Sequence, residues 1–362
     1  MELKVQTDQD PAAGFPQIPK LKARAVPFLG KLWWEAFGKK GHDLFPLHLF
    51  FSLASLRPSA IARYTSAMEG VPLGKRVVAF PGPVNLGALI AEGEVLFIDA
   101  GLDDGTARKL WRWAEEQGLR PRGAILTHAH ADHFGGAHLW EKRGLPLFAS
   151  ALEGAIMEQP LFEPVFLYGG ASPHPDLLGK FTLAEPCRIR GKLAPGKVEI
   201  GPFAVEIVDL PGHAPTQIGV RFDGVLFCAD ALFPSAILQK HPIPFCYDLD
   251  QALSTLSLLE AETVVPGHGP ILSGTKLSAE REAFRTRLEE ILELVRSALD
   301  SPKTAEEILG CVASALGEKL RDLPSFLLAR TTIFAALTSL VRAGQAQAFL
   351  EENQLLWRSE DG

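Results

Sequence analysis

Four side chains of the types that ligate metal ions lie close together in the sequence, at His128, His130, Asp132 and His133. They follow an apolar run, residues 123–127, that predicts a β-strand, and they precede two glycines that allow a tight turn. In an extended segment the first three side chains point one way and His133 points the other way. That alternation suits a loop between two metal ions. Imidazoles and a carboxylate without a thiolate suit Zn²⁺, with Fe or Mn as alternatives.

Three further candidate ligands, His213, Asp230 and His268, each follow an apolar run that predicts a strand. Strands that end in polar residues can deliver those side chains to one site at the edge of a sheet. Each residue alone has an ordinary alternative. A histidine after Pro-Gly is commonly a solvated turn residue, a strand-end aspartate is commonly a helix cap, and His130 alone could be a hydrogen-bonded core residue. The seven together, in this order, favour a two-metal site.

The order and context of these residues resemble the metallo-β-lactamase superfamily over about residues 77–274. The resemblance implies an αββα sandwich, a fold of the α/β (α+β) class, built around two metal ions. It also implies the ligands. One ion would be held by His128, His130 and His213, the other by Asp132, His133 and His268, and Asp230 would bridge both.

Asp99, which precedes Ala-Gly, matches an early aspartate of the superfamily that supports the histidine loop from behind the ligands. Its alternative role is to start the turn that follows. The chain departs from the family pattern in two places. Ala214 follows His213 where many relatives continue with threonine, and Ala229 stands before Asp230 where glycine is usual. Neither departure removes a ligand.

The chemistry that the resemblance implies follows from the metals. Two divalent ions that share a water lower its pKa towards ~7, so a metal-bridging hydroxide is present at neutral pH. The protein is therefore expected to be a dinuclear metal-dependent hydrolase. Asp132 is the expected catalytic residue, which orients the hydroxide or takes up its proton.

Several subfamilies are excluded by particular residues. The cysteine ligand of the best-known β-lactamase class is missing, because Cys228 lies in a predicted strand and is expected in the core. The glutamate that marks the di-iron flavoprotein reductases is replaced by His130. The segment between Asp230 and His268 is too short for the large insert of the nucleases that process mRNA ends. The glutathione-binding tail of glyoxalase-II relatives is also not found.

The stretches 167–170 and 243–248 resemble a group of hydrolases with a C-terminal winged-helix-like domain, whose substrates range from thioesters and lactones to single-stranded RNA. Because the body is acidic and shows no basic groove, we expect a carboxylic ester, thioester or lactone, with an RNA phosphodiester as the alternative. Tyr168 and Tyr247 flank the ligand segments. They either line the substrate pocket as hydrogen-bond donors or pack as half-buried residues.

The organisation along the chain predicts three regions: an N-terminal extension at 1–76, a catalytic domain at 77–277 and a small unit at 278–362. In the last region helical periodicity, a Thr304 capping box and two short strands after 325–342 are typical of a winged helix. A winged helix could make this a ligand-sensing DNA-binding regulator. That region carries ten Lys/Arg against fourteen Asp/Glu, so nucleic acid is an unfavoured partner.

The N-terminal region is rich in aromatic residues and carries eleven Lys/Arg against six Asp/Glu over residues 1–76. Residues 28–56 hold most of its aromatic side chains, including Trp33 and Trp34. We expect them to form a lid or a homodimer surface, because large aromatic residues usually bury against protein. Contact with a membrane through an interfacial amphipathic segment is the less favoured alternative.

The overall composition, 47% hydrophobic and 22% charged residues, is close to the average for a soluble globular protein. The net charge is −7 and the pI is about 5.8, so no overall basic field attracts nucleic acid or an anionic membrane. Four cysteines without a Cys-x-x-Cys pair indicate free thiols in a reducing compartment. No signal peptide is predicted, and we expect a cytoplasmic location.

Overall fold

The computed structural model describes residues 68–360. Residues 1–67 and 361–362 lie outside the described part, and so does the aromatic segment 28–56. The predictions of a lid, a homodimer surface or a membrane contact in that segment therefore remain predictions. The fold below is that of residues 68–360.

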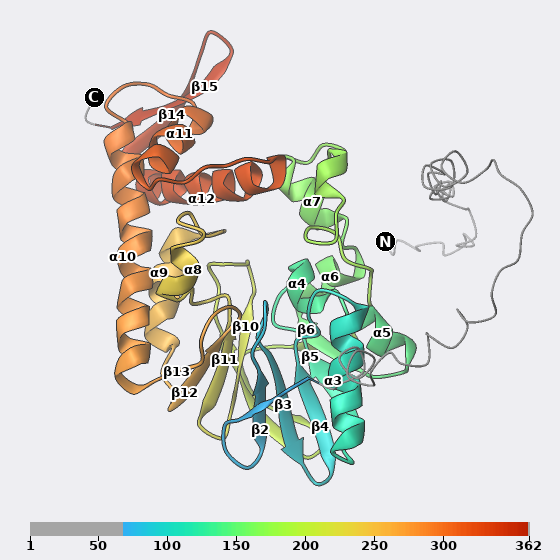
Figure 1. Ribbon diagram of the computed structural model, residues 1–362. Helices are drawn as coiled ribbons and strands as arrows, with labels where there is room; N and C mark the ends of the chain where they lie inside the picture. Colours follow the sequence, from blue (N-terminus) through green and yellow to red (C-terminus); the bar gives the residue numbers. More distant parts are fainter. Residues whose placement is uncertain (1–67, 361–362) are drawn as a thin grey trace, which may run out of the picture. The chain divides into compact units, whose positions relative to one another are not determined.

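The first sheet has seven strands that lie side by side in sequence order (Figure 1). They are β1 (Val71–Pro72), β2 (Val77–Phe80), β3 (Leu86–Ala91), β4 (Glu94–Ile98), β5 (Arg120–Ile125), β6 (Leu147–Ser150) and β7 (Gly191–Leu193). Strands β1 to β4 are antiparallel and β4 to β7 are parallel. Parallel neighbours require crossover connections, and these supply the helices on the outer face of this sheet.

The second sheet has six strands in the order β13-β12-β11-β10-β9-β8. They are β8 (Gly196–Ile200), β9 (Phe203–Asp209), β10 (Ile218–Phe222), β11 (Val225–Ala229), β12 (Thr263–Pro266) and β13 (Leu272–Ser273). Hairpins join β8 to β9 around residues 201–202 and β10 to β11 around residues 223–224. Strands β11 and β12 are parallel, so both end at the same edge of the sheet.

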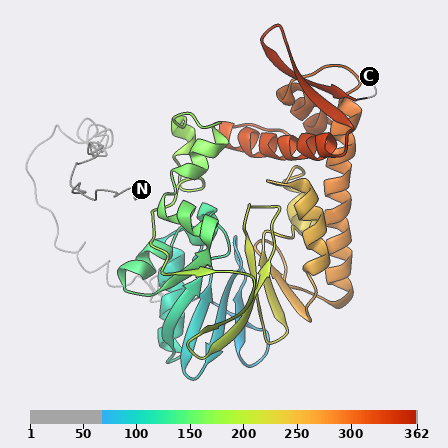
Figure 2. The same ribbon diagram turned by 180° about the vertical axis from the view of Figure 1, so that it is seen from behind.

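Alternating side chains place the two sheets face to face. In β4, Leu96 and Ile98 join a core that also contains Val205 and Ile207 of β9, whereas Val95 and Phe97 point to the opposite face. Helices α3 (Asp104–Glu116), α5 (Ala137–Lys142) and α6 (Ala151–Glu158) cover that opposite face. Helices α9 (Leu249–Thr255) and α10 (Gly274–Ala298) cover the outer face of the second sheet (Figure 2). The predicted αββα sandwich is confirmed.

The remaining short helical segments lie in connecting loops. They are α4 (Ala131–Phe134), α7 (Phe162–Leu167), α8 (Ser235–Leu238) and the 3₁₀ turns η3 (Pro175–Leu177) and η4 (Leu256–Leu258). Helix α3 begins at Asp104, because the Asp103 side chain accepts from the Thr106 N–H and caps it. Helix α9 ends at Thr255 and continues only as η4.

The C-terminal region contains α10, α11 (Ala305–Ala315), α12 (Leu323–Arg342) and the hairpin β14 (Ala346–Glu351) and β15 (Gln354–Ser359). Three helices followed by a hairpin is the predicted order, and the Thr304–Glu307 capping box is present. The identification as a winged helix stays a prediction. Helix α10 begins before residue 278 and crosses the expected domain boundary without a break. Its buried side chains share one core with the outer face of the second sheet.

Helix α12 is apolar along its length. Among the described residues it is the one helix long and apolar enough to cross a membrane by length and composition, and half of its most apolar window is buried inside the protein. Nine of its residues, including Ile333 and Leu337, are buried. Six of these residues pack into the same core as α9, α10 and α11, so the helix is a core element of this fold.

The shared core leads to a prediction about truncation. A chain that ends at Leu277 would lose Leu288, Ile291 and Leu337 and so uncover the apolar surface of α9 and the second sheet. We expect this fragment to aggregate and to lose its cooperative thermal unfolding, as measured by light scattering and circular dichroism. A soluble, cooperatively folded fragment would instead support an independent domain from residue 278.

Candidate active site

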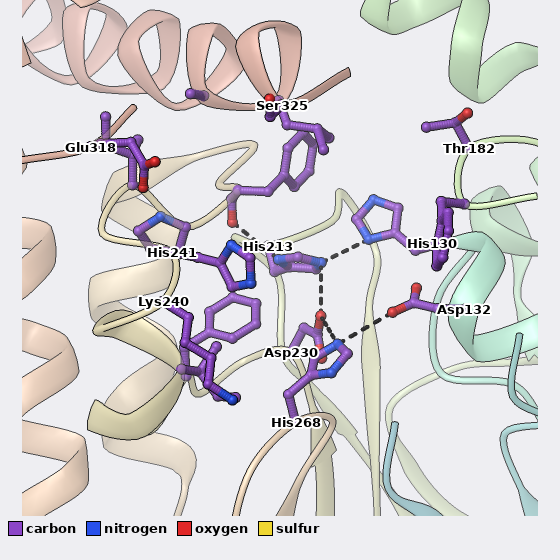
Figure 3. Close-up of a pocket in the computed structure, with 18 of the residues that line it drawn as sticks. His130, Asp132, Thr182, His213, Asp230, Lys240, His241, His268, Glu318 and Ser325 are labelled. Carbon is purple, nitrogen blue, oxygen red and sulfur yellow. Dashed lines mark hydrogen bonds and ion pairs between the residues drawn. The ribbon is translucent and has the colours of Figure 1, made fainter. Parts of the chain in front are cut away.

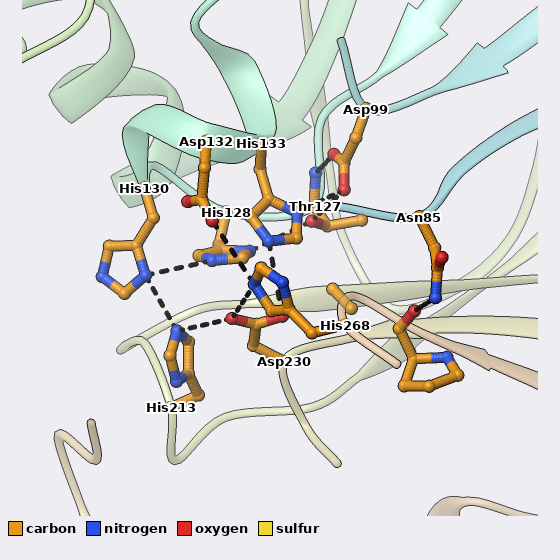
Figure 4. A network of polar contacts seen from close by, with 12 residues as sticks. Asn85, Asp99, Thr127, His128, His130, Asp132, His133, His213, Asp230 and His268 are labelled. Carbon is orange, nitrogen blue, oxygen red and sulfur yellow. Dashed lines mark hydrogen bonds and ion pairs between the residues drawn. The ribbon is translucent and has the colours of Figure 1, made fainter. Parts of the chain in front are cut away.

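The seven candidate ligands meet at one end of the sandwich, where strands of both sheets end (Figure 4). Strand β5 leads into the loop and short helix α4 that carry residues 128–133. Strand β9 is followed by His213, strand β11 by Asp230 and strand β12 by His268. Strands β11 and β12 are apolar and almost wholly buried up to their last residues, so their polar side chains appear only at this edge.

The ligand atoms fall into overlapping sets of three. The sets are His128, His130 and His213; His128, His133 and Asp230; and Asp132, His133 and His268. Within each set the ligand atoms lie within 4.8 Å of one another. The first and third sets are the two triads that the resemblance implied. Asp230 lies between them, with Oδ1 3.3 Å from His133 Nε2 and Oδ2 3.4 Å from His213 Nε2.

Four of the five histidines are held from behind through Nδ1. His128 Nδ1 lies 3.1 Å from Thr127 Oγ1. His213 Nδ1 donates to the Phe245 carbonyl at 3.1 Å, and His268 Nδ1 donates to the Pro83 carbonyl at 2.6 Å. A ring fixed in this way turns its Nε2 lone pair towards the centre of the site, which is the arrangement usual for metal-ligating histidines.

Asp99 fixes His133, the fourth of these histidines, and also Thr127, which directly precedes the ligand loop. Its carboxylate accepts from the Thr127 N–H at 2.8 Å, from Thr127 Oγ1 at 2.9 Å and from His133 Nδ1 at 2.8 Å. Its backbone is left-handed with φ 59°, a conformation that aspartate tolerates better than most residues. Asp99 therefore acts behind the ligands, as the resemblance implied, and does not merely start a turn.

The donor set fits divalent metal ions. His133 Nε2 and Asp230 Oδ1 are buried atoms without a hydrogen-bond partner, which is costly for polar groups unless a ligand completes them. His130 Nδ1 lies 3.1 Å from His128 Nε2 and 2.8 Å from His213 Nε2, so three ring nitrogens converge on one point. Neutral imidazoles and carboxylates grouped in this way suit a cation such as Zn²⁺.

The ionisable groups of the cluster have strongly shifted pKa values. Burial, with His213 beside it, lowers the pKa of His130 to about 3. Burial raises the pKa of the Asp132 carboxyl, but His133 and His268 outweigh this and bring it to about 2. Burial likewise opposes the charged form of His268, yet Asp230 and Asp132 raise its pKa to about 10. Opposed shifts of this size in one cluster are typical of functional sites.

A cavity of about 480 Å³ opens above the ligands (Figure 3). Its walls are mainly apolar and include Phe181, Phe233, Ile243, Phe245, Leu320 and Leu328. Helix α12 forms one side of it, through Ser325, Leu328 and Ala329. The C-terminal region therefore contributes directly to the space in which a substrate would lie.

Tyr168 and Tyr247 were expected either to line the substrate pocket or to pack as half-buried residues. Neither is among the described residues that line the cavity. Tyr168 ends helix α7 and is half-buried, and Tyr247 is 50% exposed, with its N–H donating to the Gly212 carbonyl. Both lie near the ligand loops, but the side chain that reaches the cavity from the second loop is that of Phe245.

The sequence analysis missed two buried polar residues that brace the ligand loops. Glu153 accepts from the Ala129 N–H and from the Thr216 N–H, both at 3.0 Å, and so joins the loops of His128 and His213. Asn85 donates to the Pro266 and Gly269 carbonyls, both at 2.8 Å, and braces the loop of His268. Both lie in unremarkable local sequence, so no spacing or motif signal marks them.

Comparisons with known proteins agree with this geometry. The sequence model of the metallo-beta-lactamase superfamily matches residues 79–268, just over half of the chain. The probable metallo-hydrolase YqgX of Bacillus subtilis is 29% identical over 201 residues, which are 52% of this chain and 87% of that protein. A hydroxyacylglutathione hydrolase of Halorhodospira halophila is 27% identical, over 62% of this chain and 74% of its own. The acyl-coenzyme A thioesterase MBLAC2 of Gallus gallus is 26% identical, over 50% of this chain and 71% of its own.

A similar fold occurs in the crystal structure of a β-lactamase domain protein from Burkholderia ambifaria. The TM-score is 0.63, and the match covers 80% of this chain and 93% of that chain. Because the sequence identity is 21%, this likeness concerns the fold alone. The match extends beyond residues 79–268, so part of the similarity lies outside the region matched by the sequence model.

The close packing behind the ligands gives a prediction at Gly267. A Cβ there would overlap Asp230 Oδ1 and would lie 2.8 Å from His133 Cε1. We therefore expect Gly267→Ala to displace both side chains and to lower metal affinity at least roughly 10-fold, as measured by chelator competition.

Gly310→Ala is the matched control, because no atom lies within 4 Å of a Cβ at that position in helix α11. We expect this control to keep its metal content and to gain up to about 1 kcal/mol of stability from helix propensity. Wild-type metal affinity in Gly267→Ala would contradict the packing described here.

Proposed function

The chain belongs to the metallo-β-lactamase superfamily, and we propose on this premise that it is a two-metal hydrolase that cleaves a carboxylic thioester. The observation that carries the proposal is the convergence of seven ligand side chains beneath a largely apolar cavity. One ion would be held by His128, His130 and His213, the other by Asp132, His133 and His268, with Asp230 between them. We propose Zn²⁺ as the metal, because the ligands are imidazoles and carboxylates.

Ions bound there would lower the pKa of a water molecule and polarise the carbonyl of the substrate. The protein's own contribution centres on Asp132. Its side chain is 28% exposed and lines the cavity, whereas Asp230 is buried. Its carboxylate is ionised at neutral pH, and Oδ2 lies 3.3 Å from His268 Nε2. Asp132 can therefore accept a hydrogen bond from the attacking water and fix its orientation.

A thioester is preferred over RNA because of the charges and shape of the cavity. Of the described residues that line it, Lys240 is the single lysine or arginine, while Glu163 and Glu318 are acidic. A nucleic-acid backbone requires several cationic contacts along a groove. The apolar walls instead suit an acyl chain, and one of the similar proteins is named as an acyl-coenzyme A thioesterase.

The contacts of α12 weigh against the alternative of a DNA-binding regulator. Its two arginines are both engaged within the protein. Arg330 pairs with Glu306 and donates to the Leu167 carbonyl, and Arg342 pairs with Asp248 and Asp250. Because both arginines of α12 are engaged in contacts within the protein, the helix has few cationic groups left to contact DNA phosphates.

The proposal predicts a defined substrate profile. Purified protein loaded with Zn²⁺ should hydrolyse acyl-coenzyme A thioesters and should leave single-stranded RNA oligonucleotides intact. Asp132→Asn should lower kcat about 100-fold or more, because the attacking water loses the group that orients it. His213→Ala should lower both activity and metal content.

Asp300→Asn is the control, because this aspartate is fully exposed and lies between α10 and α11. It should keep wild-type activity. If the wild-type protein cleaves RNA but hydrolyses no thioester, and Asp132→Asn loses the RNA cleavage, the thioesterase proposal is wrong. The protein would then be a phosphodiesterase. Chain-length dependence of kcat/KM, measured with short and long acyl thioesters, tests whether the apolar walls bind the acyl group.

A further inference from the structure

Helix α12 forms hydrogen bonds with the loop 244–246. The Phe245 carbonyl in this loop accepts a hydrogen bond from His213. Thr332 Oγ1 donates to the Pro244 carbonyl at 2.8 Å and accepts from the Cys246 N–H at 3.1 Å. Thr332 is fully buried, so this one hydroxyl satisfies two backbone groups that have no access to water. The two groups belong to the residues on either side of Phe245.

Phe245 links this loop to the ligand cluster. Its carbonyl accepts from His213 Nδ1 at 3.1 Å, and its ring packs edge-on against the rings of His213 and His130. With residues 244 and 246 both bonded to Thr332, the carbonyl of residue 245 has little freedom to turn away. The orientation of the His213 ring thus depends on a hydroxyl of the C-terminal region.

A second set of contacts ties α12 to the other side of His213. Arg342 Nη1 lies 2.9 Å from Asp248 Oδ2 and 3.1 Å from Asp250 Oδ2. The Asp248 N–H donates to the carbonyl of Gly212 at 3.0 Å, directly before His213 in the sequence. Both ends of the segment 244–250 are therefore attached to α12 while its middle part contacts the loop of His213.

We propose that Thr332 is a positioning residue for the metal ligand His213, and that α12 is thereby a working part of the metal centre. The proposal rests on the proposed two-metal site. Its physical basis is the tautomer of His213. While Nδ1 donates to a fixed carbonyl, Nε2 carries the lone pair that faces His130 and Asp230. A carbonyl free to move permits other ring orientations, and these weaken binding of an ion at the first triad.

The effect should be selective for one of the two triads. The histidines of the other triad are anchored by Asp99 and by the Pro83 carbonyl, which belong to the first sheet and its loops. None of these contacts involves α12. A loss confined to the triad of His213 would therefore separate positioning from a general loss of stability.

The test is metal affinity in Thr332→Val, which keeps the size of the side chain and removes the hydroxyl. Chelator competition with Zn²⁺ should show roughly 10-fold weaker binding of one ion and unchanged binding of the other. The variants His213→Ala and His268→Ala identify which binding step belongs to which triad. Thr332→Ser restores the hydroxyl and should restore wild-type affinity.

Thr331→Val is the matched control. Thr331 is the preceding residue on α12, and its hydroxyl donates to the Leu327 carbonyl within the same helix. It should leave both affinities unchanged. Arg342→Gln provides a second variant, at a position where the arginine side chain itself is 54% exposed. It removes the contacts to Asp248 and Asp250, and it should weaken the same ion by a smaller factor.

Three outcomes would overturn the proposal. They are wild-type affinities in both Thr332→Val and Arg342→Gln, an equal loss at both triads, or an equal loss in Thr331→Val. If Thr332→Val does not fold, Arg342→Gln and Thr332→Ser decide the question. If the wild-type protein binds no metal, the two-metal function itself fails, which is a different result from unchanged affinity in the variants.

Discussion

The structure depends above all on the need to hold five imidazoles and two carboxylates together in a largely buried site. Such groups are costly to bury unless each is paired or completed by a cation. Residues outside the cluster hold the ligand side chains in place. Thr127, Asp99, Phe245 and Pro83 each fix one histidine through Nδ1, and they come from four different segments. The two sheets bring these segments to one edge, and the geometry of the site follows from the ends of their strands.

The ligands themselves could be predicted from the sequence, because their signal is local. Each lies directly after a buried strand, and the alternation of apolar side chains along such a strand can be recognised in a few residues. The partners behind the ligands could not be predicted in the same way. Two of them, at Phe245 and Pro83, are backbone carbonyls, which any residue type provides. Glu153 and Asn85 are bonded to loops far away in the sequence, and their neighbours give no hint of this.

The C-terminal region illustrates a different limit of sequence reasoning. Helical periodicity correctly predicted that one face of α10 is apolar, but it cannot say which surface covers that face. The region was expected to be a separate small unit, whereas its helices share a core with the second sheet. For the two tyrosines the sequence left open whether they line the pocket or pack as half-buried residues. Loop side chains take their direction from tertiary contacts, and here the loop after Pro244 turns Phe245 towards the ligands while Tyr247 stays half-exposed.

The site therefore has two halves with different origins. The half that binds metal is built from strand ends of the sandwich, within the region that matches the superfamily. The half that faces a substrate is built from α12 and from the loops that carry Phe181 and residues 240–245. Substitutions in the second half can alter the shape and polarity of the cavity without removing a ligand. Similarity across the superfamily thus supports the metal chemistry, whereas the choice of substrate has to be argued from the walls that this chain provides. Thr332 is where the two halves meet, because one hydroxyl on the substrate side helps to set the direction of a ligand on the metal side.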